Sequence, residues 1–455
     1  MENGIQGSLK KMYYYPQGFF LGIYEMRSKK MGKKNFYENV NMKQTIRTFI
    51  AKIPLAKSLC HAIKKEREEV RTRPVQAKLR NKHPIIRQGS PDCFEGLPLR
   101  VCWDVTSHCN FRCSYCFQAS SEYKKVFCTL EQAETAIKHL ASANRPSYQV
   151  TLMGGEPTTH PHLAEIIILL CQYLGDRLEQ LGITTNGSFS ESQMKAILKV
   201  GEQVNVKLFI SVHLEYMNVE RVVELVKQYS PHTRLQISLM FHPELVDKAI
   251  SVAEALCGLK RDYPFEIHVN MLREAPKFDK FDSRYTQEHF NCAERIRERF
   301  RRTNAEGPKR PENQREIIGR KYLVEKNVNG FIECHERISQ SKLRDLTGNV
   351  FTGMTCCAGT SIVKILVDGR VMGMICGVDQ PIYNIFEENP FLREDWIHGV
   401  LCTHDMCGCD VDFRIPKFKL PADAHKFLAE KRKEQKKLIN EKRRDAEASI
   451  HTPFE

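Results

Sequence analysis

Short apolar runs rich in β-branched residues alternate with amphipathic stretches over residues 99–272. The stretches have the three- and four-residue spacing of helices, and two begin with the spacing of a capping box, Thr129 with Gln132 and Ser190 with Gln193. Strands that alternate with helices indicate βαβ units and a parallel sheet. Six such units predict a partial (β/α)6 barrel of the TIM type rather than a closed eight-stranded one. The predicted strands are Leu99–Val105, Tyr148–Met153, Gly182–Thr185, Val206–Val212, Leu235–Phe241 and Phe265–Leu272.

The pattern changes after residue 303. Residues 303–316 are polar and rich in Gly and Pro, as is typical of a linker. Beyond them, Asn329-Gly330 and Asp368-Gly369 each separate two β-like runs, as tight hairpin turns do. A charged helix is expected from about residue 422 to residue 448. We therefore expect an N-terminal extension (1–95), the barrel (96–305), a small α+β domain with hairpins (306–420) and a charged helical tail (421–455).

Charge separates the N-terminal extension from the rest. Residues 1–90 hold 20 Lys and Arg against 6 Glu, whereas the remainder holds 49 basic and 49 acidic residues. Ile46, Phe49, Ile50 and Ile53 recur at helical spacing, which predicts a mostly helical, basic segment with one apolar face. Such a face can bind an anionic membrane surface, an acidic partner or nucleic acid, or it can pack against the next domain.

The cysteines of this chain are unevenly placed. No window approaches the roughly 20 apolar residues of a membrane-spanning helix, and the N-terminus lacks the order of a secretory signal. A cytoplasmic location is therefore expected, where clustered cysteines are more often metal ligands or catalytic groups than disulfides. Nine of the seventeen cysteines fall in two groups, 109–116 and 356–409, and the other eight are scattered along the chain.

The first group follows the first predicted strand. Cys109, Cys113 and Cys116 have C-x3-C-x2-C spacing, so three thiolates on one loop can hold three irons of a cubane and leave the fourth open. Structural zinc, which takes four ligands, is the alternative. The segment HCNFRCSYCFQ (His108–Gln118) resembles the signature of the radical S-adenosylmethionine (SAM) superfamily, in which an aromatic residue, here Tyr115, precedes the last cysteine.

Three further segments resemble motifs of the same superfamily, each at the end of a predicted strand. Met153–Pro157 resembles the GGE motif, which implies that its backbone and the carboxylate of Glu156 face the amino group of SAM. The other two are the TTNG segment after the third strand and the SVH segment after the fourth. The cofactor-binding residues implied by the resemblance are Tyr115, Gly154, Gly155, Glu156, Thr184, Asn186 and Ser211.

The resemblance also implies a mechanism. The three cysteines would bind a [4Fe–4S] cluster whose open iron chelates SAM. An electron from a donor such as flavodoxin or ferredoxin would cleave SAM to methionine and a 5′-deoxyadenosyl radical, which takes a hydrogen atom from the substrate. The cofactor carries this chemistry, while the protein positions it and excludes solvent.

The second group lies beyond the barrel. Phe351–Cys376 resembles the opening of the SPASM or twitch extensions of some radical SAM enzymes, which implies a second, auxiliary [4Fe–4S] cluster. Many members have the second ligand where this chain has Met374, and Cys376 lies two residues further on the same strand face. A zinc site or a redox-active cysteine cluster is the alternative. The expected ligands are Cys357 and Cys376 with two of Cys402, Cys407 and Cys409.

The sequence is compatible with several classes of substrate. Polar residues at strand ends are candidates for catalysis, namely His213, His242, Arg273 and Glu274. The resemblance to SPASM-like enzymes favours a peptide or protein side chain. A twitch-type enzyme would oxidise a small molecule such as a sugar or aminocyclitol, and RNA modification through the basic segment is a third alternative. A non-enzymatic iron–sulfur protein would not need the GGE motif.

Overall fold

The computed structural model describes residues 85–89, 98–116, 126–201, 204, 206–274, 280–306, 308, 322–328, 331–338, 350–376, 382–404, 407 and 415–450. The chain forms two compact units, Met1–Arg71 and Thr72–Glu455, and every described residue belongs to the second. The amphipathic helix predicted within residues 42–73 lies outside the described residues, as does Cys409.

Six parallel strands lie side by side in chain order and confirm the partial barrel. They are β2 (Leu99–Thr106), β3 (Tyr148–Gly154), β4 (Leu178–Thr185), β5 (Val206–His213), β6 (Arg234–Phe241) and β7 (Phe265–Met271). Within the described part of the chain β7 ends the sheet, so the barrel stays open. β4 begins at Leu178, four residues before the predicted start at Gly182. The glycine lies inside the strand, where it is tolerated.

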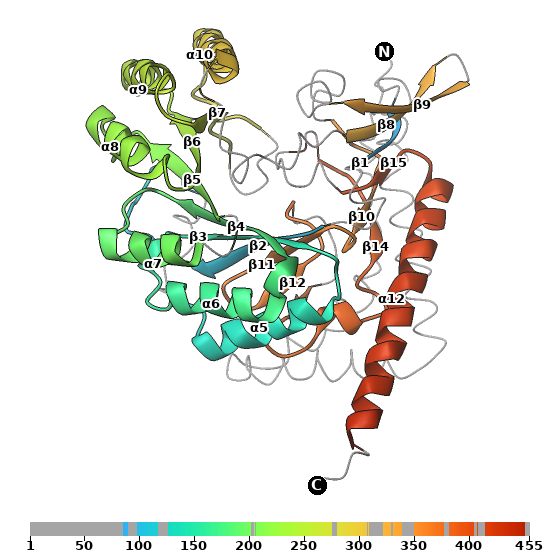
Figure 1. Ribbon diagram of the computed structural model, residues 1–455. Coiled ribbons are helices and arrows are strands. Elements are labelled where there is room, and N and C mark those ends of the chain that lie inside the picture. Colours follow the sequence, from blue (N-terminus) through green and yellow to red (C-terminus); the bar gives the residue numbers. More distant parts are fainter. Residues whose placement is uncertain are drawn as a thin grey trace, which may run out of the picture. The chain divides into compact units, whose positions relative to one another are not determined.

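Helices connect these strands and cover one face of the sheet (Figure 1). The connecting helices are α5 (Leu130–Ser142), α6 (Leu163–Leu174), α7 (Glu191–Gly201), α8 (Val219–Tyr229) and α9 (Val246–Leu259), and α10 (Gln287–Glu306) follows β7. Both predicted capping boxes are confirmed. Gln132 N donates to Thr129 Oγ1 at 3.1 Å and Thr129 N donates to Gln132 Oε1 at 2.9 Å. Ser190 and Gln193 exchange the same two hydrogen bonds at the start of α7. Such caps are worth about 1 kcal/mol each.

Alternate side chains of each barrel strand point to opposite faces. On β2, Val101, Trp103 and Val105 are buried in the main core under the helices. Asp104 and Thr106 therefore lie on the inner face, away from the helices. The same alternation runs along the other strands, so the inner face is the polar one. Thr184, Ser211 and His213 lie on it at the C-terminal ends of β4 and β5.

A strand from the C-terminal third extends this sheet next to β2. β11 (Ile362–Ile365) pairs with β2 in parallel, with Ile365 opposite Trp103. β12 (Arg370–Met372) and β13 (Tyr383–Asn384) follow in antiparallel order. The hairpin turn at Asp368-Gly369 is confirmed, and Gly369 has a φ of 85°, which favours glycine. The hairpin extends the barrel sheet, although the sequence assigned it to the small domain 306–420.

A second sheet has the order β14-β10-β15-β1-β8-β9. Its strands are β1 (Ile85–Gly89), β8 (Tyr322–Val328), β9 (Phe331–Ile338), β10 (Thr355–Ala358), β14 (His398–Leu401) and β15 (Lys417–Phe418). Val328 lies opposite Phe331, which confirms the hairpin at Asn329-Gly330. β1 belongs to this sheet, whereas the sequence placed residues 85–89 in the helical extension.

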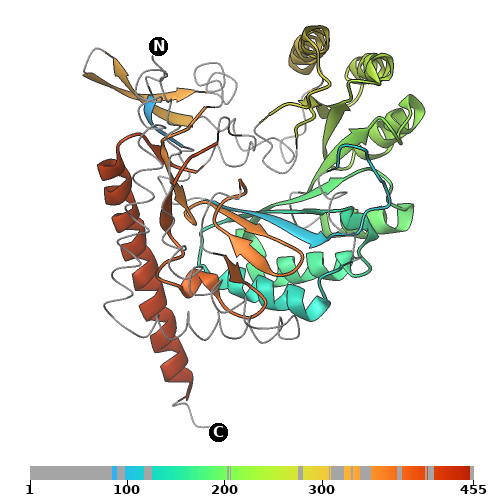
Figure 2. The same ribbon diagram turned by 180° about the vertical axis from the view of Figure 1, so that it is seen from behind.

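The charged tail is helical, as predicted. α12 (Pro421–Ile450) contacts β10, β14 and β15 of the second sheet along its first half (Figure 2). The remaining short elements are the 3-10 helices η2 (Pro157–Thr159), η3 (Gly175–Arg177) and η5 (Pro390–Leu392). Among the helices described here, none combines the length and apolarity that crossing a membrane requires.

Candidate active site

The three cysteines of the first group lie on a loop, residues 107–116, that begins where β2 ends; we call it the cysteine loop. Cys113 is buried, and Cys109 and Cys116 are half-buried. Burial raises the pKa of Cys113 to about 12, and the charges of Glu215, Cys116 and Cys109 add to the increase. The three thiols are therefore neighbours whose thiolates repel one another, and a positively charged iron–sulfur core would compensate that repulsion.

The three cysteines of this loop fit an iron–sulfur cluster better than a single metal ion. A zinc ion needs its ligands to converge on one point, and no group of three or more His, Cys, Asp or Glu among the described residues does so. A cubane takes one cysteine per iron, so its ligands stand apart around it. Neighbouring cysteines on a loop held by hydrogen bonds meet that requirement.

The two glycines of the GGE segment pack against the cysteine loop. Gly155 N donates to Thr106 O at 2.8 Å and Glu156 N donates to His108 O at 2.7 Å. A Cβ on Gly154 would lie 2.1 Å from Thr106 O, and a Cβ on Gly155 would lie 2.1 Å from His108 O. Backbone atoms of Thr106 at the end of β2 and of His108 in the cysteine loop therefore require glycine at these two positions.

The carboxylate of Glu156 connects the ends of β3 and β4. It is 1% exposed and accepts four hydrogen bonds. Thr158 donates its N at 3.1 Å and its Oγ1 at 2.7 Å, Thr185 Oγ1 donates at 2.7 Å, and Asn186 N donates at 2.6 Å. Burial raises the pKa of Glu156, and these donors oppose the increase. Three of the four hydrogen bonds go to Oε1 and one goes to Oε2, so the carboxylate joins the ends of the two strands. Its contact with SAM stays a prediction.

Asn186 continues from this carboxylate to the cysteine loop. Its Nδ2 donates to Asn110 Oδ1 at 2.9 Å and lies 3.8 Å from Cys109 Sγ. Asn110 Nδ2 in turn donates to Ser188 Oγ at 2.8 Å. Of the predicted cofactor contacts, Asn186 is thus placed next to the cysteines, and Thr184 and Ser211 lie half-buried on the inner face.

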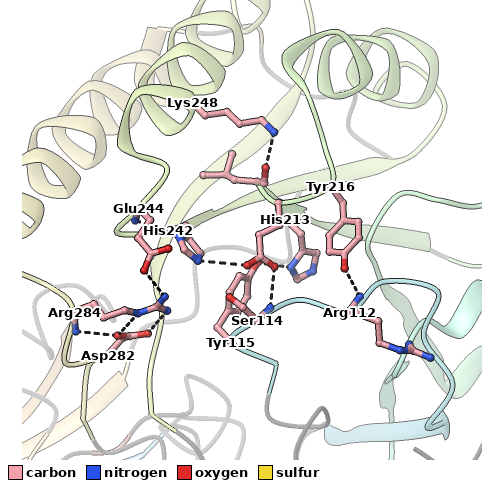
Figure 3. A network of polar contacts seen from close by, with 12 residues as sticks. Arg112, Ser114, Tyr115, His213, Tyr216, His242, Glu244, Lys248, Asp282 and Arg284 are labelled. Carbon is pink, nitrogen blue, oxygen red and sulfur yellow. Dashed lines mark hydrogen bonds and ion pairs between the residues drawn. The ribbon is translucent and has the colours of Figure 1, made fainter.

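The segment after β5 contacts the other side of the cysteine loop (Figure 3). Tyr115 Oη lies 2.7 Å from His213 Nδ1. Burial lowers the pKa of His213 to about 4 and raises the pKa of Tyr115, so the contact joins a neutral imidazole and a neutral hydroxyl. Glu215 and Tyr216 hold two backbone N–H groups of the same loop. Sequence reasoning singled out neither of these two residues.

His242 follows β6 and is 3% exposed. Its Nδ1 accepts a hydrogen bond from Glu244 N at 3.2 Å, so the neutral ring carries its proton on Nε2. Nε2 lies 3.5 Å from Glu215 Oε1, which is an electrostatic contact too long and poorly aligned for a hydrogen bond. The Tyr115 ring lies 5.6 Å away between centroids. The structure thus brings two of the four catalytic candidates, His213 and His242, together beside the cysteines.

The other two candidates, Arg273 and Glu274, are placed differently. The guanidinium of Arg273 lies 4.7 Å over the ring of Phe281. Glu274 is exposed, and its Oε1 accepts a hydrogen bond from Ser283 N at 3.2 Å. Both residues therefore order the segment that follows β7. Their position after β7 was the basis for the predicted catalytic role, which stays a prediction.

The second cysteine group divides between two faces of β10. Cys357 is fully buried in the main core. Its neighbour Cys356 points the other way, into a smaller apolar cluster with Phe351, Met354 and Cys402. Adjacent residues of a strand face opposite sides. The structure therefore replaces Cys357 by Cys356 as the cysteine of β10 on the side of Cys402.

Three further cysteines approach one another on that side. Burial raises the pKa of Cys402 to about 12, and the charges of Cys407 and Cys376 add to the increase. Cys376 and Cys407 pack against the same apolar cluster as Cys356. His404 Nε2 donates to the carbonyl of Cys376 at 3.2 Å. The described members of this second cysteine cluster are therefore Cys356, Cys376, Cys402 and Cys407.

Sequence reasoning missed an ion pair on the inner face. Lys364 of β11 donates from Nζ to Asp104 Oδ1 at 2.5 Å, and the same Nζ lies 3.7 Å from Met153 Sδ. Both charged side chains are nearly buried, at 11% and 13% exposed. Met153 directly precedes the two glycines. The β11 strand thus contributes a side chain to the wall that bears the cysteine loop and the GGE segment.

A profile of the Radical SAM superfamily matches residues 103–247 of the chain. The match begins within β2 and ends at the start of α9, so it includes the cysteine loop and the three strand-end motifs. The resemblance drawn from those motifs is thereby confirmed for the barrel.

Curated relatives match over short segments. The antilisterial bacteriocin subtilosin biosynthesis protein AlbA of Bacillus subtilis (strain 168) is 25% identical over 140 residues, which are 31% of this chain and 29% of that protein. A GTP 3′,8-cyclase of Erythrobacter litoralis (strain HTCC2594) is 30% identical over 105 residues, which are 23% of this chain and 32% of that protein. The chain thus matches less than a third of the length of either relative.

Among solved structures, Streptococcus suis SuiB aligns with 65% of this chain and 64% of its own, with a TM-score of 0.42 and 18% identity. A TM-score this low does not establish a shared fold. The fold therefore rests on the strand order and pairing described above.

Proposed function

Since residues 103–247 are a radical SAM domain, we propose that this chain is an enzyme that cleaves SAM reductively and abstracts hydrogen from a peptide or protein side chain. One observation carries the first part. The cysteine loop, the GGE segment and Asn186 are joined into one hydrogen-bonded unit at the C-terminal ends of β2, β3 and β4. That end is where barrels built from βα units have their active sites.

The residues of this unit have distinct tasks in the proposal. Cys109, Cys113 and Cys116 hold a [4Fe–4S] cluster, and Tyr115, Thr184, Asn186 and Ser211 line the space for SAM. When bound, the cluster and SAM supply the electron and the carbon-centred radical. Gly154, Gly155 and Glu156 hold the loop in place from behind.

Two observations support a peptide as the substrate. AlbA is named for the biosynthesis of a bacteriocin. The inner face also opens toward β7, where His268 and Asn270 are exposed, so a substrate larger than a metabolite can reach the inner wall there.

A small-molecule substrate is the second candidate. The GTP 3′,8-cyclases are named for a nucleotide. The inner wall carries the hydrogen-bonding groups that a hydroxyl-rich ligand would use, such as Ser211 and Ser238.

We also propose an auxiliary [4Fe–4S] cluster at the second cysteine cluster. Cys356, Cys376, Cys402 and Cys407 supply four thiols, which is the number a closed cubane takes. Cys409, outside the described residues, remains a candidate ligand by sequence. An electron donor of the flavodoxin or ferredoxin type is the proposed redox partner.

The test combines metal analysis with product analysis. Protein purified and reconstituted without oxygen is analysed for iron and sulfide, as wild type and as the triple variant C109A/C113A/C116A. Both samples are then reduced with dithionite in the presence of SAM and assayed for 5′-deoxyadenosine. About eight irons in wild type, about four in the variant, and deoxyadenosine from wild type alone are expected.

The substrate is tested by adding cell-extract fractions to the same assay. A peptide fraction that increases deoxyadenosine and gains a mass change supports the peptide proposal. If only the peptide-free metabolite fraction does so, the small-molecule alternative holds. A well-loaded wild-type protein that makes no deoxyadenosine overturns the proposed function.

A further inference from the structure

The loop that follows β5 holds the cysteine loop at two points between its cysteines. Glu215 Oε2 accepts a hydrogen bond from Ser114 N at 2.9 Å. Tyr216 Oη accepts one from Arg112 N at 2.8 Å. The two contacts join segments about a hundred residues apart, at 101 and 104 residues. They fix the backbone on either side of Cys113.

This holding loop is itself anchored. The ring of Tyr216 stacks on that of Phe111 at 4.4 Å between centroids and 9° between planes. Lys248 of α9 donates from Nζ to the carbonyl of Leu214 at 2.6 Å (Figure 3). Glu215 therefore approaches the cysteine loop from a backbone position that two neighbouring elements define.

The charge of Glu215 is also oriented. One carboxylate oxygen faces the Ser114 N–H, and the other faces Nε2 of His242 at 3.5 Å. The His242 ring is locked in that direction because its Nδ1 is occupied by Glu244 N. Glu215 is 22% exposed, so water screens its charge only in part.

We propose that Glu215 is a positioning residue for the iron–sulfur cluster at Cys109, Cys113 and Cys116: it fixes the cysteine loop through Ser114 and lowers the reduction potential of the cluster by its negative charge. The proposal rests on the proposed function. The reduction potential of such clusters depends on nearby charge, hydrogen bonding and exposure. A fixed negative charge disfavours the added electron, so the reduced cluster becomes the stronger donor that cleavage of SAM requires.

The experiment measures the midpoint potential of the cluster whose electron paramagnetic resonance signal changes when SAM is added. Full-length reconstituted protein is titrated as wild type, E215Q, E215D and E224Q. Gln at 215 keeps an oxygen for Ser114 N and removes the charge. Glu224 of α8 is the matched control, because it is 60% exposed and paired with Arg221 on the surface.

We expect E215Q to change the ratio of reduced to oxidised cluster about tenfold at a fixed potential, an upward shift of about 59 mV for a one-electron couple. E224Q and E215D should stay near the wild-type value. A shift in E215Q no larger than that in E224Q overturns the inference. So does a shift in E215D as large as that in E215Q, since Asp retains the charge.

The proposed function and the role of Glu215 are overturned by different results. If wild-type protein shows no signal that responds to SAM, both the proposed function and this inference are overturned. If wild type responds normally and E215Q has the wild-type potential, only the inference is lost. Should E215Q load no iron, a loaded E215D with the wild-type potential supports the need for a carboxylate at this position.

Discussion

Lys364 and Asp104 lie 260 residues apart in the chain and form a nearly buried ion pair on the inner face of the barrel. Lys364 belongs to β11, and Asp104 belongs to the strand that leads into the cysteine loop. Burial raises the pKa of Asp104, and the neighbouring Lys364 opposes the increase. The pair therefore couples the C-terminal third of the chain to the wall of the candidate active site.

Replacing one charged residue of this pair should destabilise the fold. We expect K364M and D104N each to lower the free energy of unfolding by about 3 to 5 kcal/mol, because each leaves one buried charge uncompensated. The double variant should be more stable than the sum of the single changes predicts. Urea denaturation of all four proteins measures the coupling.

The control for that cycle is K138M, which removes an exposed pair with Glu134 on α5. It should cost no more than about 1 kcal/mol. Additive effects of K364M and D104N would contradict a direct interaction between the two side chains.

Gly155→Ala should displace the cysteine loop. The new Cβ would lie 2.1 Å from His108 O, a backbone atom that cannot move without moving the loop. We expect loss of the SAM-responsive cluster, measured as about four irons fewer per chain. Gly258→Ala is the matched control, because nothing lies within 4 Å of a Cβ at that position of α9. Equal iron content in both variants would show that the loop tolerates the displacement.

Glu156→Gln separates two roles for this side chain. If the carboxylate chiefly connects β3 and β4, the amide will place its NH2 against donors such as Asn186 N and lower the stability by about 1 to 3 kcal/mol or more. E165Q, on the exposed side of α6, should leave stability nearly unchanged. Normal stability of E156Q together with lost SAM binding by calorimetry would instead support the contact predicted from the GGE motif.

Cys356→Ala and Cys357→Ala should differ, although the residues are adjacent. C356A should lose the auxiliary cluster and about four irons. C357A should keep its iron and lose only packing in the main core, since Cys357 is fully buried there. Iron and sulfide analysis of the two variants distinguishes them. Loss of iron in C357A alone would restore the ligand set expected from the sequence.

The barrel could be predicted from the sequence because the patterns that indicate its strands and helices lie within short segments of the chain. Alternating apolar runs and two capping boxes marked the units, and each motif came at a strand end. Which of Cys356 and Cys357 lies on the side of Cys402 could not be predicted. It depends on which face of a four-residue strand each residue occupies. The hydrogen bonds of Glu156 could not be predicted either, because their donors Thr185 and Asn186 are distant in sequence. Nor could the pairing of β11 with β2, because no local sequence pattern indicates the partner of a strand.

The parallel pairing of β11 with β2 has a consequence for synthesis of the chain. A ribosome completes β2–β7 long before it makes Ile362–Ile365, so the nascent barrel presents an unpaired β2 edge. Exposed strand edges recruit other chains, and long-range pairings form slowly. A protein truncated before β11 should therefore aggregate during expression even though all six barrel strands are present.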